Sequence, residues 1–221
     1  MLFSNWSFEV SMPIAAEIMP DGCRDLIIVS RNGRVEQVLF SDWDWQPREV
    51  TLLPGQQFCG FRFRPGLLPD LAELEAIRAC CLDKNEVLQD ARVSSLLLPD
   101  WEILQIIDAL ALEGKSVKAV AAQAGVSERT LQRRFAVKGL PAPEYWRQLG
   151  RARRAALALT RCQSLSAISA DSGYSDQAHM TRDFSRWFGM TPRRLQQAPD
   201  RLALLAHSGL GNWTEEQIST R

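Results

Sequence analysis

Residues 117–135 read VKAVAAQAGVSERTLQRRF, and residues 165–184 read LSAISADSGYSDQAHMTRDF. The two stretches repeat one order of apolar, small, glycine and serine positions at an offset of 48 residues. Beyond the serine the offset becomes 49, so that Leu131 matches Met180 and Phe135 matches Phe184. The second stretch therefore holds one extra residue, and the repeat predicts two copies of one supersecondary unit.

Each copy predicts a helix, a short turn and a second helix. The first helix buries residues three apart and carries a small residue where another helix crosses closely. A glycine suited to the left-handed conformation ends it, and the next residue fills the core. These positions are Val117, Val120, Ala121, Gly125 and Val126 in the first copy and Leu165, Ile168, Ser169, Gly173 and Tyr174 in the second.

The second helix of each copy is expected to begin at a serine, Ser127 or Ser175, whose hydroxyl can accept a backbone N–H as the N-cap. Its buried face holds Leu131 and Phe135, or Met180 and Phe184. The opposite face presents Arg129, Gln132 and Arg133 in the first copy and Gln177, Ala178, His179, Thr181 and Arg182 in the second. Arginine and glutamine are the side chains that read guanine and adenine edges in the major groove, so each copy predicts a helix-turn-helix.

A long helix is predicted between the copies, from Pro143 to Thr160, with basic residues Arg147, Arg151, Arg153 and Arg154. One helix-turn-helix pattern alone occurs in many proteins that never bind DNA, but two in register on a rigid connector indicate a DNA-reading domain. Successive major grooves on one face of B-DNA lie about 34 Å apart. The sequence therefore predicts one chain that reads two adjacent grooves.

Residues 173–192, GYSDQAHMTRDFSRWFGMTP, closely resemble the signature segment of AraC/XylS transcription regulators, which ends in Phe-Gly-x-Thr-Pro. Residues 117–135 resemble the first helix-turn-helix of that family and residues 143–159 its linker helix, so the resemblance covers about residues 113–196. It implies base-reading roles for Arg129, Gln132, Arg133, Gln177, Ala178 and Arg182, with His179 and Thr181 at the edge. It also implies phosphate contacts, here expected from Ser127, Thr130 and Ser175, and charge adds Arg186.

The resemblance further implies an activator that contacts RNA polymerase beside a promoter. Ala178 cannot read a base through hydrogen bonds, because its methyl side chain offers only apolar contact to a thymine methyl. We therefore expect weaker specificity in the second groove. Neither a cofactor nor a metal is implied for this domain.

The charge of the chain, 26 Lys and Arg against 26 Asp and Glu, divides unevenly between its halves. Residues 1–112 hold 9 basic and 17 acidic side chains, whereas residues 113–221 hold 17 basic and 9 acidic ones. Within residues 114–199, 15 basic side chains face only five acidic ones. That excess predicts a phosphate-binding surface, although charge alone is equally typical of a solvated basic face.

The N-terminal half is predicted to be β-rich up to about residue 68. Asn32-Gly33 between the apolar runs 25–30 and 34–40 favours a hairpin with a type I′ turn, and 50–53 and 57–64 predict further strands. From residue 69 to about 113 the apolar spacing becomes helical, through Leu71, Leu74 and Ile77 and then Ile103, Leu104, Ile107 and Leu110.

A looser resemblance links PDGCRDLI (residues 20–27) and GFRFRPG (residues 60–66) to the shorter sensor domains of the same family, which implies a small-molecule effector site or a homodimer through this half. Arg62 and Arg64 are candidates for an anion clamp, or for a solvated strand face. The aromatic residues favour a core over a ligand pocket: Trp6, Phe8, Phe40, Trp43, Trp45, Phe58, Phe61 and Phe63. A cupin-type metal site is disfavoured, because His179 and His207 lie in the other half.

The first nine residues lack a basic leader and apolar core, and no apolar run approaches the roughly 18 residues of a membrane span, so we expect a cytoplasmic protein without a membrane partner. Five cysteines without a CxxC pair indicate neither disulfides nor a zinc ribbon. We expect that the protein is not an enzyme. The alternative is a DNA-repair enzyme with an alkyl-accepting cysteine on the same DNA-binding module, for which Cys23 beside Arg24 is the candidate. A third hypothesis has the acidic half blocking the basic half.

The sequence thus predicts an α+β protein. Residues 1–68 form a small β-rich effector or dimerisation domain, 69–112 a helical connector, and 113–200 an all-α domain with two helix-turn-helix units joined by a long helix. Residues 201–221 are expected to be a C-terminal tail. The predicted function is a sequence-specific regulator of transcription that binds double-stranded DNA.

Overall fold

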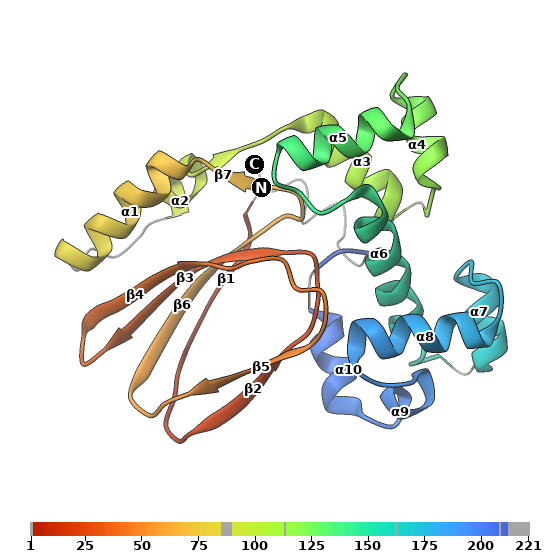
Figure 1. Ribbon diagram of the computed structural model, residues 1–221. Helices are drawn as coiled ribbons and strands as arrows, with labels where there is room; N and C mark the ends of the chain where they lie inside the picture. Colours follow the sequence, from red (N-terminus) through yellow and green to blue (C-terminus); the bar gives the residue numbers. More distant parts are fainter. Residues whose placement is uncertain (1, 85–89, 113, 162, 208, 212–221) are drawn as a thin grey trace.

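The computed structural model describes residues 2–84, 90–112, 114–161, 163–207 and 209–211. Its N-terminal half contains a four-stranded antiparallel sheet in the order β1-β6-β3-β4, and the chain is α+β as predicted (Figure 1). The strands are β1 (Leu2–Glu9), β3 (Arg24–Arg31), β4 (Arg34–Phe40) and β6 (Gln56–Phe63). A separate ribbon pairs β2 (Ile14–Ile18) with β5 (Arg48–Leu52), and β7 (Leu68–Pro69) pairs with β8 (Leu97–Leu98).

The predicted hairpin is confirmed. Asn32 and Gly33 connect β3 to β4 with φ angles of 51° and 73°, the positive values that a type I′ turn requires. The predicted strands 50–53 and 57–64 correspond to β5 and β6 with shifts of one or two residues. The sequence did not predict the four remaining strands, which are β1, β2, β7 and β8.

The two faces of the four-stranded sheet differ. One face buries Leu26, Phe61 and Phe63 in a core that is completed by α1 (Leu71–Lys84) and α2 (Asp90–Ser95). On the other face Trp6 stacks on Phe8, with ring centroids 5.7 Å apart. Gly60 makes room for Trp6, because a Cβ there would lie 2.1 Å from the indole ring. The aromatic residues are thus only partly core, and the ring of Phe8 is 45% exposed.

A second core joins the helices of the C-terminal half around α6 (Pro143–Ala158), which stands between two helical units in Figure 1. The other helices there are α4 (Val117–Gln123), α5 (Glu128–Val137), α7 (Leu165–Asp171), α8 (Gln177–Phe188), α9 (Pro192–Gln196) and α10 (Pro199–Ala206). Helix α3 (Trp101–Ala111) also packs here, through Ile103, Ile107 and Leu110. Leu71 was predicted to belong to the apolar face of the connector helices, but it is 71% exposed.

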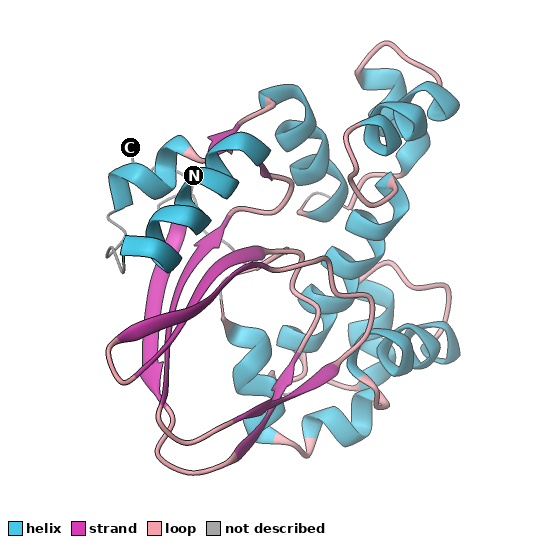
Figure 2. Ribbon diagram, turned by 60° about the vertical axis from the view of Figure 1, so that its left-hand side comes forward, coloured by secondary structure: helices cyan, strands magenta, loops and turns pink. Residues whose placement is uncertain are grey.

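The two halves pack against each other along α6, and Figure 2 shows the sheet and the helices as neighbouring layers. Met19 belongs to the second core although it precedes β3. Trp43 meets Trp146 of α6 edge-on with centroids 5.1 Å apart, and the Tyr145 hydroxyl donates to the carbonyl of Asp44 at 3.0 Å. The linker helix is therefore held by the N-terminal half as well as by the units at its ends.

Candidate nucleic-acid interface

The first helix-turn-helix unit consists of α4 and α5. Ser127 caps α5 as predicted, because its hydroxyl accepts the backbone N–H of Thr130 at 3.1 Å. Gly125 has a φ of 67°, so it ends α4 in the left-handed conformation that a glycine adopts freely. Leu131 and Phe135 are fully buried, which fixes the opposite face of α5 toward solvent. The predicted side chains Arg129, Gln132 and Arg133 are all exposed on that face.

Two ion pairs attach α5 to α3, in addition to the buried core. Arg134 Nη1 lies 2.6 Å from Glu102 Oε1, and Lys138 Nζ lies 2.7 Å from Asp100 Oδ2. Asp100 also caps α3, and Lys138 together with the Ile103 N–H holds the pKa of its carboxyl below the usual range. The basic residues of α5 therefore divide into two sets, one bound to α3 and one free to meet a partner.

The second unit, α7 and α8, begins its second helix one residue later than predicted. Asp176, rather than Ser175, is the N-cap: its carboxylate accepts the His179 N–H at 2.6 Å. That backbone N–H holds the pKa of Asp176 below its ordinary value. The later start of α8 explains the extra residue of the second unit, since four residues (124–127) connect α4 to α5 whereas five (172–176) connect α7 to α8.

Helix α8 buries Met180 and Phe184 as predicted and exposes Gln177, Ala178 and Arg182. The two other candidates of this unit are half-buried and already engaged. Thr181 Oγ1 donates to the Gln177 carbonyl at 2.9 Å. His179 lies between Ser175 Oγ, 3.1 Å from Nδ1, and Arg151 Nη2, 3.4 Å from Nε2. Of the predicted base-reading side chains, three are therefore exposed on α5 and three on α8.

The four candidate phosphate contacts lie near the helix ends. Ser127 Oγ and Thr130 Oγ1 are 2.9 Å apart, so both hydroxyls already share a hydrogen bond at the start of α5. Ser175 contacts His179, as described above. Arg186 is exposed toward the end of α8, where its guanidinium lies 4.6 Å from the ring centroid of Trp187 and donates to Gln148 Oε1 at 2.9 Å.

The basic residues of the linker helix do not all contribute to a surface. Arg147 pairs with Glu144 on the same helix, and Arg154 is half-buried. Arg151 and Arg153 are buried, at 6% and 1% exposure, and bind partners inside the protein. The predicted phosphate-binding surface is therefore smaller than the basic count suggests, because two of its members form internal contacts.

Two further N-caps were not predicted. Ser116 and Ser164 accept the N–H groups of Ala119 and Ala167, each at 3.2 Å, and so begin α4 and α7 at equivalent positions. Their offset of 48 residues, and a serine directly before an apolar helix, was a usable signal in the sequence. The repeat is thus one residue longer at its start than the quoted stretches.

The side chains considered for other chemistry lie elsewhere. Cys23 is buried, and burial raises the pKa of its thiol well above the ordinary value, which disfavours the thiolate that an alkyl-transfer enzyme needs. Arg62 pairs with Asp21 and Asp25, and Arg64 lies beyond the end of β6, where it pairs with Asp108 of α3. The two arginines thus form neither an anion clamp nor a solvated strand face.

Between residues 2 and 211, apart from the undescribed positions, no group of three or more His, Cys, Asp and Glu is placed to hold a metal ion. Among the helices of these same ranges, none combines the length and the apolar character needed to cross a bilayer.

Comparison with known proteins matches residues 120–198 to the family described as "Helix-turn-helix domain". Over 79 residues the chain is 40% identical to the HTH-type transcriptional regulator VirS of Mycobacterium tuberculosis. The matched stretch covers 36% of this chain and 23% of VirS. The chain therefore spans about a quarter of the length of the curated relatives it matches.

Two solved structures are similar with TM-scores below 0.5. An AraC-type transcriptional regulator from Chromobacterium violaceum shares 26% identity at a TM-score of 0.37, covering 48% of this chain and 90% of that one. ToxT from Vibrio cholerae shares 8% identity at a TM-score of 0.44, covering 88% and 97%. The assignment depends instead on the matched domain, the VirS similarity and the paired units described above. The helix-turn-helix domain at residues 120–198 therefore resembles that of AraC/XylS transcription regulators.

Proposed function

We propose that the protein regulates transcription by placing α5 and α8 in two successive major grooves of one DNA duplex. The observation that carries this proposal is the pair of exposed polar helix faces at the two ends of α6. In Figure 1 both units lie along α6 with their first helices, α4 and α7, on the same side. Sixteen residues make α6 about 24 Å long at 1.5 Å per residue. Since the two units pack at its two ends, we expect α5 and α8 to lie farther apart than this length, as a groove spacing of about 34 Å requires.

Base reading is assigned first to Arg129, Gln132 and Arg133, whose donors and acceptors fit guanine and adenine edges. In the second groove the open residues are Gln177, Ala178 and Arg182. His179 and Thr181 belong to the edge of that surface, because both are tied to neighbouring groups. Fewer hydrogen-bonding side chains reach the second groove, so we expect its base preference to be weaker.

Contacts with phosphate are assigned to Ser127, Thr130, Ser175 and Arg186. The hydroxyls and the N-terminal N–H groups of α5 and α8 suit phosphate oxygens at helix starts. Arg186 is exposed and stacked on Trp187, so its charge is held in a defined place. These contacts fix the register of the protein on DNA without reading sequence.

Activation through RNA polymerase, an effector in the N-terminal half and a homodimer through that half are parts of the same proposal. They follow from the family rather than from a contact in the structure. The aromatic sheet face with the half-buried Trp6 and the exposed Phe8 supports the effector assignment, because apolar rings that reach the surface suit a small apolar ligand.

Selection of binding sites from a random pool of double-stranded DNA tests the proposal. With the full chain we expect two blocks of enriched sequence whose centres lie about 10 base pairs apart, the stronger block assigned to α5. Loss of preference in the first block with Arg129→Ala and in the second with Arg182→Ala would assign the helices. A pool without enriched sequence, or with a single block, would refute the reading of two grooves.

A further inference from the structure

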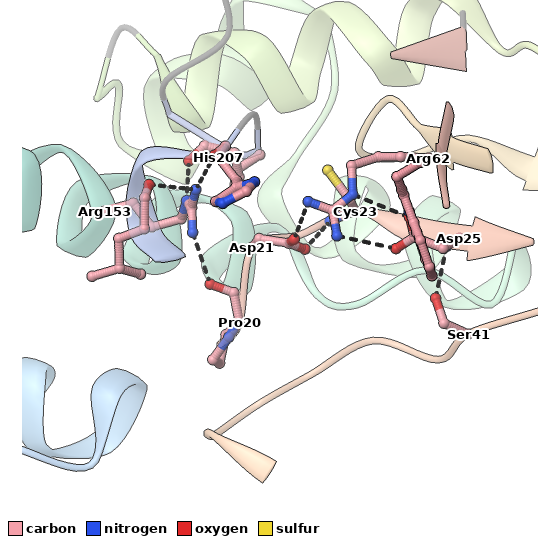
Figure 3. A network of polar contacts seen from close by, with 11 residues as sticks. Pro20, Asp21, Cys23, Asp25, Ser41, Arg62, Arg153 and His207 are labelled. Carbon is pink, nitrogen blue, oxygen red and sulfur yellow. Dashed lines mark hydrogen bonds and ion pairs between the residues drawn. The ribbon is translucent and has the colours of Figure 1, made fainter. Parts of the chain in front are cut away.

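Arg153 lies inside the protein at the junction of three segments (Figure 3). Its Nε donates to the carbonyl of Leu210 at 2.9 Å and its Nη1 to that of Pro20 at 3.2 Å. Its Nη2 donates to the carbonyls of Leu205 and His207 at 3.1 and 3.0 Å. One side chain of the linker helix thus binds the N-terminal half, the end of α10 and the segment after it at once. We call these four carbonyls the Arg153 cage.

The N-terminal side of the cage continues into the sheet. The Asp21 carbonyl accepts the Leu210 N–H at 2.6 Å, and Asp21 Oδ2 lies 3.0 Å from Arg62 Nη1. Arg62 Nε in turn lies 3.1 Å from Asp25 Oδ1, which also accepts the indole N–H of Trp6 at 3.0 Å. Polar contacts therefore run from the exposed aromatic face of the sheet to the linker helix.

Arg151, two residues earlier, makes the corresponding connection to the second recognition helix. Its Nη2 lies 2.5 Å from Asp183 Oδ2 of α8, and its guanidinium lies 4.2 Å from the ring centroid of Tyr174. Both side chains of the ion pair are nearly buried, at 8% and 13% exposure. Because residues two apart on a helix point about 200° apart, the two arginines leave α6 on opposite sides.

The geometry points to a coupling role for this pair: Arg153 is a positioning residue through which the N-terminal half sets the orientation of α8 on DNA. The inference rests on the proposed function and adds the route by which one half influences the other. A buried guanidinium is tolerated only while its hydrogen bonds are filled. If the loop 20–23 moves, the cage opens, and α6 must shift to let Arg153 find other acceptors. Since Arg151 ties α8 to α6, the recognition helix moves with it.

The first unit is attached differently, which gives the inference a selective outcome. Helix α5 shares the core around α6, but its polar ties run to α3 through the exposed pairs Arg134–Glu102 and Lys138–Asp100, neither of which involves the cage. Breaking the cage should therefore disturb the second groove more than the first. A purely structural role of Arg153 would weaken both grooves in parallel, because it would lower the fraction of folded protein.

Hydroxyl-radical footprinting of the full chain with Arg153→Met tests the coupling, on a duplex that the wild type selects. Methionine keeps an apolar chain of similar length without the guanidinium. We expect the concentration that protects the second groove to rise roughly two- to thirtyfold while the concentration that protects the first groove rises less. Arg154→Met is the matched control, since it removes the neighbouring charge of the same helix outside the cage, and it should leave both protections unchanged.

An unchanged pattern, or an equal loss in both grooves by a variant whose circular dichroism is native, would overturn the inference. If Arg153→Met does not fold, the same footprint with Asp21→Asn decides: a selective loss in the second groove supports the coupling, and no change or a uniform loss refutes it. A wild-type chain that protects neither groove would instead remove the proposed function.

Discussion

Arg133 and Arg182 occupy equivalent positions in the two repeats, and both are exposed beside buried aromatic anchors, Phe135 and Phe184. The residue after Arg133 behaves differently: Arg134 points to α3 and pairs with Glu102. Two adjacent arginines of α5 thus have separate tasks, one toward DNA and one toward the protein. We therefore expect replacement of Arg133 and replacement of Arg134 to have different effects.

Arg133→Ala should raise the free energy of specific binding by about 1–3 kcal/mol and relax the preference at a single base pair. The physical reason is the loss of a guanidinium that reads one guanine. Fluorescence anisotropy with duplexes changed at each position would measure both effects. Arg134→Ala is the matched control, and it should alter stability slightly without changing which base is preferred. An equal loss on every duplex would mean that Arg133 contacts only phosphate.

The residues that sequence reasoning misplaced are those whose partners lie far along the chain. Arg151 and Arg153 have the basic spacing of a surface helix, yet Asp183 is 32 positions away and Pro20 is 133. No local pattern indicates such partners. By contrast, Leu131 and Met180 were placed correctly, because their burial follows from helical spacing alone.

At the scale of the helices, the repeat predicted both units, and the structure moved only one boundary. The turn into α8 has one more residue than the turn into α5, so the cap passes from Ser175 to Asp176. Serine and aspartate are both good N-caps, which is why sequence alone did not separate them. Strand β1 was missed for a different reason: its partners in β6 lie 48 (Glu9 to Gln57) to 61 (Leu2 to Phe63) residues away.

Helix α8 should lose its N-terminal order in acid. The pKa of Asp176 is held below its usual value by the His179 N–H, so its stabilising contribution is present above about pH 4 and is lost as the pH falls through the lowered pKa. Amide exchange of the first turn of α8, followed from neutral to acidic pH, would report this. Asp176→Asn should keep the cap and abolish the pH dependence, and Ser175→Ala should leave the exchange unchanged. Faster exchange in Ser175→Ala would restore the serine as the cap.

At the scale of the whole molecule, the two halves share packed surface along α6. Met19 lies in the C-terminal core, Trp43 meets Trp146, and the Tyr145 hydroxyl donates to the Asp44 carbonyl. Composition had suggested two opposite-charged halves, and the contacts that join them include an aromatic pair, a hydrogen bond of Arg153 to Pro20 and the ion pair of Arg201 with Glu17. The acidic half therefore rests on the linker helix, and blocking of the recognition faces stays a hypothesis.

Shared packing predicts that both halves unfold in one transition. Far-UV circular dichroism and tryptophan fluorescence should give the same midpoint in urea. Trp43→Ala should lower the free energy of unfolding by about 1–3 kcal/mol for both probes, because it removes a contact between the halves. Trp101, which is 58% exposed, supplies the control. Trp101→Ala should change the free energy of unfolding by less than about 0.5 kcal/mol. Two separate midpoints in the wild type would show that the halves are independent.

One chain is proposed to occupy two adjacent major grooves of one duplex. Hydroxyl-radical footprinting at one chain per duplex, with the stoichiometry fixed by native mass measurement, tests it most directly. We predict two protected patches on one face of the DNA, centred about one helical turn apart. A single protected patch at that stoichiometry, or a second patch that is protected only when a second chain binds, would contradict the account.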